Sequence, residues 1–210
     1  MASPIDMVYI IDTSRSTSDK LIMQMKEYVE KELESHNKGS PNLNVAIVNY
    51  GSYAVIVNPL TPVSKFDRLN SSLSALTKVG GERQIHKALR KAYTDILRGT
   101  GTSRAKHVVL FVAGQNGLTR VNELSLAAQS LRDSGADLTV VAIGNRIDDD
   151  DLDDIGGNVI KLPNGDSLPD IIVLVSGGVG ASAGNFFYFH VFYHDHLPIL
   201  IGNLYGFTFT

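Results

Sequence analysis

The segment His107–Ala113 (HVVLFVA) restricts the fold of this chain most, because it is apolar at almost every position. A strand with one face in water alternates apolar and polar side chains, whereas a strand buried on both faces does not. Continuous apolar strands are typical of parallel sheets that are covered by helices on both sides. Met7–Ile11 and Leu138–Ile143 are apolar in the same way. The sequence therefore predicts a buried, mostly parallel central sheet.

Amphipathic helices are predicted between these strands. Helical spacing of apolar residues predicts helices in five segments: 18–35, 64–76, 85–96, 124–131 and 148–155. A hairpin of strands 43–50 and 53–57 turns at Gly51-Ser52, with Pro59 and Pro62 closing it. An edge strand is expected at 159–162, and a last helix at 171–175 with Ser167 as N-cap. This alternation predicts a doubly wound α/β sheet, in which binding sites lie at the carboxyl ends of the strands.

Composition excludes several classes of function. The 210 residues carry a formal net charge of −3, which gives no reason to expect nucleic acid as a partner. The chain has no cysteine, so a disulfide framework, a thiolate nucleophile and a Cys-ligated zinc are excluded. The first residues do not resemble a signal peptide, and no apolar run is long enough to predict a membrane span.

Three oxygen-bearing side chains follow the first predicted strand at every second position: Asp12, Ser14 and Ser16. Asp12 ends the apolar run Met7–Ile11, so it lies where the strand leaves the sheet. Oxygens at this spacing on a loop can converge on one point. A hard divalent cation such as Mg²⁺ prefers an oxygen-rich, partly hydrated site of this kind.

Four segments resemble the von Willebrand factor type A domain family. DMVYIIDTSRS at 6–16 resembles its opening strand and Asp-x-Ser-x-Ser loop, and GGERQIHKALRKA at 80–92 resembles its Gly-Gly loop and the helix that follows. RAKHVVLFVAGQNG at 104–117 and LAAQSLRDSGADLTVVAIGN at 126–145 resemble its central strand and the next helix and strand. The resemblance spans about residues 5–178 and is greatest to the domains of collagen VI-like and matrilin-like matrix proteins.

This resemblance implies a Rossmann-like fold, with one antiparallel edge strand, and an extracellular adhesion function. It also implies a metal-ion-dependent adhesion site, of which Asp12, Ser14 and Ser16 match the first ligands. The family's threonine ligand aligns with Ile85, or with Gln84 if the loop is one residue shorter, and its second aspartate aligns with Ala113. Because neither Ile85 nor Ala113 can ligate a cation, the site is predicted to be incomplete.

Several alternatives remain open for the Asp12 loop. Asp12, Ser14 and Ser16 can bind Mg²⁺ or Mn²⁺ weakly, with Glu82 as a substitute ligand. In the purely structural alternative, the two serines cap the first helix or its preceding turn, and Asp12 accepts backbone N–H bonds. A phosphate- or nucleotide-using α/β enzyme would use Asp12 as its strand-end acid, but Ala113 stands where a second catalytic group is expected.

We therefore predict a protein-interaction module without catalytic residues or a resident cofactor. It binds collagen or another matrix protein through the carboxyl-end face of its sheet, independently of divalent cations. The predicted partner-binding residues are Ser14, Arg15, Glu82, Arg83, Gln115 and Asn116.

The segments outside this site have separate predictions. The acidic run 148–154 lacks the glycine and glutamate of an EF-hand loop, so it is predicted to be a solvated helix start. The domain is predicted to span 1–178 and to be followed by an aromatic-rich tail, 179–210. That tail is a β-hairpin, a docking segment or an accidental reading frame. A zinc or copper site is a further alternative, formed by His190, His194 and His196 together with Asp195.

Overall fold

The computed structural model describes residues 4–39, 42–115 and 122–170. The predicted helix at 171–175 and the tail 179–210 lie outside the described residues. The strands are β1 (Ile5–Asp12), β2 (Leu43–Tyr50), β3 (Ala54–Pro62), β4 (Ala105–Val112), β5 (Ala136–Ile143) and β6 (Asn158–Leu162). The α-helices are α1 (Asp19–Gly39), α2 (Phe66–Ser74), α3 (Ile85–Lys91), α4 (Glu123–Asp133) and α5 (Asp149–Ile155). A π-helical segment, η1 (Ala92–Leu97), continues α3, and η2 (Gly165–Asp170) is a 3-10 helix.

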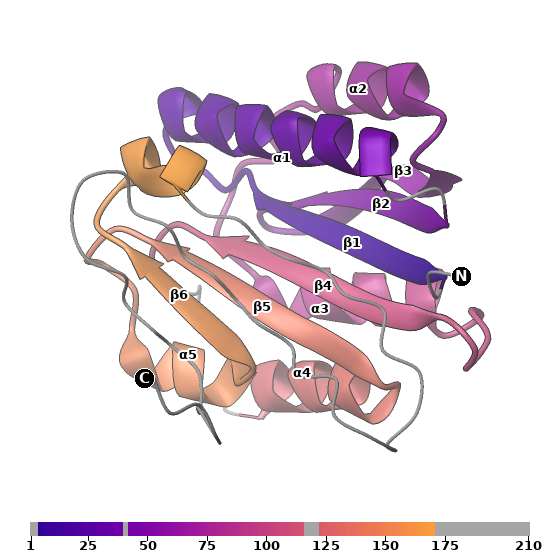
Figure 1. The fold of residues 1–210 in the computed structure, drawn as a ribbon. Coiled ribbons are helices and arrows are strands. Elements are labelled where there is room, and N and C mark those ends of the chain that lie inside the picture. The colour runs from indigo at the N-terminus through magenta and orange to yellow at the C-terminus, as the bar shows by residue number, and fades with distance from the viewer. Residues whose placement is uncertain (1–3, 40–41, 116–121, 171–210) are drawn as a thin grey trace, which may run out of the picture.

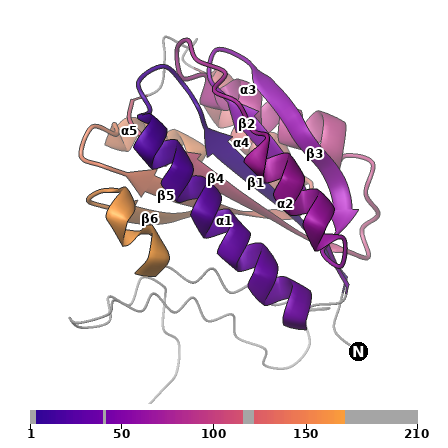
Figure 2. The ribbon, with the colours of Figure 1, turned by 90° about the horizontal axis from the view of Figure 1, so that it is seen from above.

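The strands form one sheet in the order β3-β2-β1-β4-β5-β6. Every neighbouring pair is parallel except β2 and β3, so β3 is the antiparallel edge strand. Helices α1 and α2 lie on one face of the sheet, and α3, α4 and α5 lie on the other (Figure 1). The view from above shows α1 and α2 running side by side across the sheet (Figure 2). The predicted Rossmann-like α/β fold is confirmed.

Strand β1 serves two hydrophobic cores, because successive side chains of a strand point to opposite faces. Met7, Tyr9 and Ile11 belong to the core under α1 and α2. Val8 and Ile10 belong to the core that faces α3, α4 and α5. All five side chains are fully buried, which explains why the run has no polar alternation. A strand enclosed in this way gives its last residue, Asp12, a fixed position at the carboxyl edge.

Two local details differ from the predictions. Pro62 ends β3 as predicted, but Pro59 lies inside the strand, because an edge strand with register shifts tolerates a residue that cannot donate a ladder bond. Ser167 was expected to precede a helix as its N-cap, but it lies within η2. The acidic run behaves as predicted: the Asp148 carboxylate caps α5 by accepting a hydrogen bond from the Asp150 N–H at 3.1 Å.

Two titratable side chains are largely buried on α1. The side chains of Glu32 and His36 are 14% and 15% exposed, and His36 Nε2 lies 3.7 Å from the Glu32 carboxylate. Burial raises the pKa of Glu32 to about 7 and lowers the pKa of His36 below its ordinary value. Among the described residues, no helix is long and apolar enough to cross a membrane.

The raised pKa of Glu32 predicts a pH-dependent stability. Its ordinary pKa is 4.5, so between about pH 4.5 and 7 the folded protein holds a proton that the unfolded chain releases, and stability falls as pH rises through that window. In Glu32→Gln this loss is absent. We expect urea denaturation to show the variant up to about 3 kcal/mol more stable than wild type at pH 8, and equal to it near pH 4. A difference that does not change with pH would contradict this assignment.

Candidate functional site

The candidate site lies at the carboxyl ends of β1 and β4, in the middle of the sheet. The chain passes from β1 to β2 on one side and later returns to β4 on the other, so the strand order reverses between β1 and β4. Loops diverge at such a point, which is where open α/β sheets bind ligands. Asp12 ends β1 here, and Ala113 follows β4.

The Asp12 carboxylate is fully buried and accepts four hydrogen bonds. Oδ1 accepts from the Ser14 N–H at 3.0 Å and from the Thr17 hydroxyl at 2.9 Å. Oδ2 accepts from the Ala113 N–H at 3.0 Å and from Arg83 Nε at 2.5 Å. The expectation that Asp12 accepts backbone N–H bonds is thus confirmed. Both of its oxygens are fully used by the protein itself.

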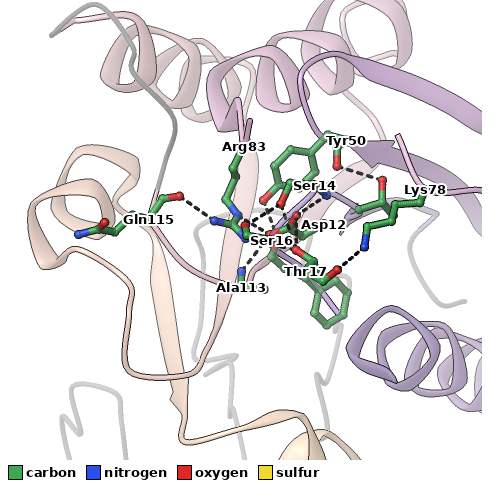
Figure 3. A network of polar contacts seen from close by, with 11 residues as sticks. Asp12, Ser14, Ser16, Thr17, Tyr50, Lys78, Arg83, Ala113 and Gln115 are labelled. Carbon is green, nitrogen blue, oxygen red and sulfur yellow. Dashed lines mark hydrogen bonds and ion pairs between the residues drawn. The ribbon is translucent and has the colours of Figure 1, made fainter. Parts of the chain in front are cut away.

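The guanidinium of Arg83 contacts the Asp12 carboxylate directly (Figure 3). Besides the Asp12 bond, Nη1 donates to the Gln115 carbonyl at 2.7 Å. Nη2 donates to the hydroxyls of Ser16 at 3.1 Å and Thr17 at 3.2 Å. The Arg83 side chain is 4% exposed, so this is a buried ion pair with most of its donors satisfied.

The Gly-Gly turn brings Arg83 to this place. Gly80 and Gly81 have φ values of 71° and 70°, a left-handed conformation that other residues rarely adopt. Backbone hydrogen bonds fix the turn: the Gly80 N–H donates to the Thr13 carbonyl at 2.9 Å, and the Arg15 N–H donates to the Gly81 carbonyl at 2.9 Å. The loop of residues 80–84 is therefore held against the Asp12 loop before any side chain contributes.

Gly114 makes room for the guanidinium. A Cβ at this position would lie 3.0 Å from Arg83 Nη1, and the φ of Gly114 is 146°. Both facts disfavour a side chain, so the turn after β4 admits the arginine because it has a glycine there. Ala113, just before it, is also small and presents its N–H to Asp12.

The residues present do not fit a divalent cation in this arrangement. A cation needs free oxygen lone pairs, and the guanidinium already contacts Asp12 and the hydroxyls of Ser16 and Thr17. Ile85, at the position of the family's threonine ligand, is fully buried in the core that faces α3. Across residues 4–39, 42–115 and 122–170, no group of three or more His, Cys, Asp or Glu side chains could hold a metal.

The structure separates the predicted site residues into exposed and buried ones. Arg15, Ser16, Glu82 and Gln115 are exposed at the carboxyl edge, whereas Ser14 is fully buried. Arg83 is 5% exposed, which corrects the expectation that it lies on the surface of the partner-binding face. Asn116 lies outside the described residues.

The roles of three residues at this site, Thr17, Ser18 and Arg83, were not predicted from the sequence. Thr17 bonds Asp12, and the Ser18 hydroxyl, not Ser14 or Ser16, accepts from the N–H of Leu21 in the first turn of α1 at 3.2 Å. Instead, the Ser14 hydroxyl pairs with the Thr17 hydroxyl at 3.1 Å. The inward direction of Arg83 was not predicted, although an arginine beside an incomplete cation site was a usable signal.

Comparisons with known proteins show the family and the fold of this chain. The family model of the von Willebrand factor type A domain matches residues 6–172. The chain belongs to this family. Human collagen alpha-1(XXI) chain is 23% identical over 150 residues, which cover 71% of this chain and 15% of that protein. Mouse matrilin-3 is 28% identical over 145 residues, which cover 67% of this chain and 30% of that protein. The matched part of this chain thus spans less than a third of the length of these two relatives.

Solved structures support the fold. Proximal thread matrix protein 1 from the mussel byssus superposes with a TM-score of 0.71 at 16% identity, covering 80% of this chain and 46% of that one. Another structure of the same byssus protein has a zinc-occupied metal-ion-dependent adhesion site (MIDAS) motif. It superposes with a TM-score of 0.69 at 17% identity. At this identity the likeness shows the fold alone.

The buried ion pair predicts a large cost for removing Asp12. In Asp12→Asn the Arg83 guanidinium stays buried without its counter-ion, so we expect urea denaturation to show a loss of about 3–5 kcal/mol. Glu34→Gln is the matched control, because the Glu34–Lys38 pair is exposed and spans 2.8 Å on α1. We expect less than about 1 kcal/mol there. Equal losses in the two variants would contradict the described burial.

Proposed function

We propose that this von Willebrand A domain is a non-enzymatic protein-interaction module of an extracellular matrix-type protein. It binds collagen or another matrix protein through the face formed by the loops at the carboxyl edge of the sheet. Binding needs no Mg²⁺ or Mn²⁺ and no other cofactor. The family membership and the matrix-protein relatives support the class of function and the extracellular location.

The observation that carries the cation independence is the Arg83–Asp12 ion pair. In a cation-dependent site a partner reaches the metal, whereas here the Asp12 oxygens lie beneath an arginine of the same chain. The exposed side chains left for a partner are Arg15, Ser16, Glu82 and Gln115. They come from the same three loops that the contacts of Arg83 connect.

A cation-dependent adhesion domain, with Glu82 as substitute ligand, is the competing function. It is disfavoured because Glu82 is exposed, whereas its neighbour Arg83 already donates a hydrogen bond to the Asp12 carboxylate. A phosphate- or nucleotide-using enzyme is disfavoured for a related reason. Ala113 contributes only its N–H at the neighbouring strand end, and Asp12 is fully buried.

Cation independence can be measured directly. We expect binding to a panel of immobilised collagens and matrix proteins to change by less than about twofold between a buffer with EDTA and one with Mg²⁺ or Mn²⁺. The physical reason is that no ligand atom of Asp12 is free for a metal. Loss of binding in EDTA, restored by Mg²⁺, would overturn the proposal.

The position of the binding face is tested by reversing one exposed charge. Arg15→Glu changes a side chain at the centre of the carboxyl edge, and we expect it to weaken partner binding by about tenfold or more. Arg68→Glu, at an exposed position of α2, is the control with the same charge change and should leave binding unaltered. Equal effects of the two reversals would show that the partner binds elsewhere or responds only to net charge.

A further inference from the structure

One guanidinium joins three loops that are far apart in the sequence. Arg83 belongs to the loop of residues 80–84. Asp12 ends β1, and Ser16 and Thr17 belong to the loop that follows it. Gln115 belongs to the loop after β4. Figure 3 shows the Arg83 side chain between these groups, with its donors directed at all of them. The arrangement of the exposed face therefore depends on a side chain that is itself buried.

The atoms that Arg83 contacts are the kind that a hard cation prefers. They are one carboxylate oxygen, two hydroxyl oxygens and one backbone carbonyl oxygen. Mg²⁺ and Mn²⁺ are bound in proteins by carboxylate, hydroxyl, carbonyl and water oxygens. A buried carboxylate needs a positive partner in any case, since an unpaired charge at 0% exposure is strongly unfavourable. The planar, forked guanidinium can meet several such oxygens at once.

We propose that Arg83 is the resident cation of this site. Its guanidinium neutralises Asp12, excludes divalent ions from the oxygen cluster and fixes the three loops in one arrangement. This inference underlies the cation independence of the proposed function, but its test involves no binding partner, so the two can fail separately. Gly114 supports it independently, because its missing side chain provides the room that Nη1 occupies.

If Arg83 is the barrier, removing it should expose a site that an added carboxylate can convert into a metal site. Ala113 is the position for that carboxylate, because its N–H lies 3.0 Å from Asp12 Oδ2. The double variant Arg83→Ala, Ala113→Asp then offers two carboxylates with the hydroxyls of Ser16 and Thr17. The single variant Ala113→Asp offers the same carboxylates with the arginine still in place.

The experiment measures Mn²⁺ binding by calorimetry and thermal unfolding with and without Mn²⁺. We expect the double variant to bind Mn²⁺ at least about tenfold more tightly than Ala113→Asp, and its Tm to rise by several degrees in Mn²⁺. The Tm of the wild type should not change. Adding Asp12→Asn to the double variant should abolish the effect, which places the ion at Asp12.

Arg104→Ala, combined with Ala113→Asp, is the matched control. Arg104 Nε also donates to a buried aspartate, Asp6, at 2.7 Å, but this pair lies at the other end of β1. Its loss should leave Mn²⁺ binding equal to that of Ala113→Asp alone.

Three outcomes would overturn the inference. The first is equal Mn²⁺ affinity with and without Arg83, and the second is a folded double variant that binds no Mn²⁺. If the double variant is unfolded without metal, its refolding yield becomes the measurement. Recovery of the fold in Mn²⁺ supports the resident-cation role, and no recovery overturns it, because metal binding then contributes nothing to the fold.

Discussion

The ion pair between Asp12 and Arg83 is the interaction on which the carboxyl edge of this domain depends. Asp12 is fixed by β1, which lies between two hydrophobic cores and cannot shift without disturbing both. A carboxylate held there needs a cation, since the cost of an isolated buried charge exceeds what nearby hydrogen bonds recover. The arrangement of the neighbouring loops follows from how that cation is supplied.

Backbone hydrogen bonds position the Arg83 loop beside Asp12, and the Arg83 side chain in turn bonds the neighbouring loops. Gly80 and Gly81 adopt positive φ values, and their turn is tied by backbone bonds to the residues after Asp12. Arg83 then reaches the Gln115 carbonyl, which has no such backbone support from the first loop among the described contacts. Residues 113–115 are tied to the first loop through side chains, by the Ala113 N–H on Asp12 and by Arg83 on the Gln115 carbonyl.

Most of the fold could be predicted from the sequence because strands buried on both faces are apolar at nearly every position. The apolar runs at β1, β4 and β5 locate the central strands, and helical spacing locates the layers around them. Boundaries that depend on backbone geometry were less predictable. Pro59 predicts the end of a strand, but β3 continues past it because it is an edge strand. Ser167 predicts a helix N-cap but lies within the 3-10 helix η2.

The candidate site was only partly predictable, for a reason that is also physical. Asp12 and its neighbours follow a recognisable spacing, but a side chain as long as arginine can point to water or inward. Its direction is decided by contacts with residues distant in sequence, such as the space at Gly114. The missing carboxylate at Ala113 was the relevant signal: a site with fewer negative charges holds a divalent ion poorly, yet it matches a single positive charge. One carboxylate with one guanidinium is electrically balanced, and two carboxylates with a divalent ion are balanced as well.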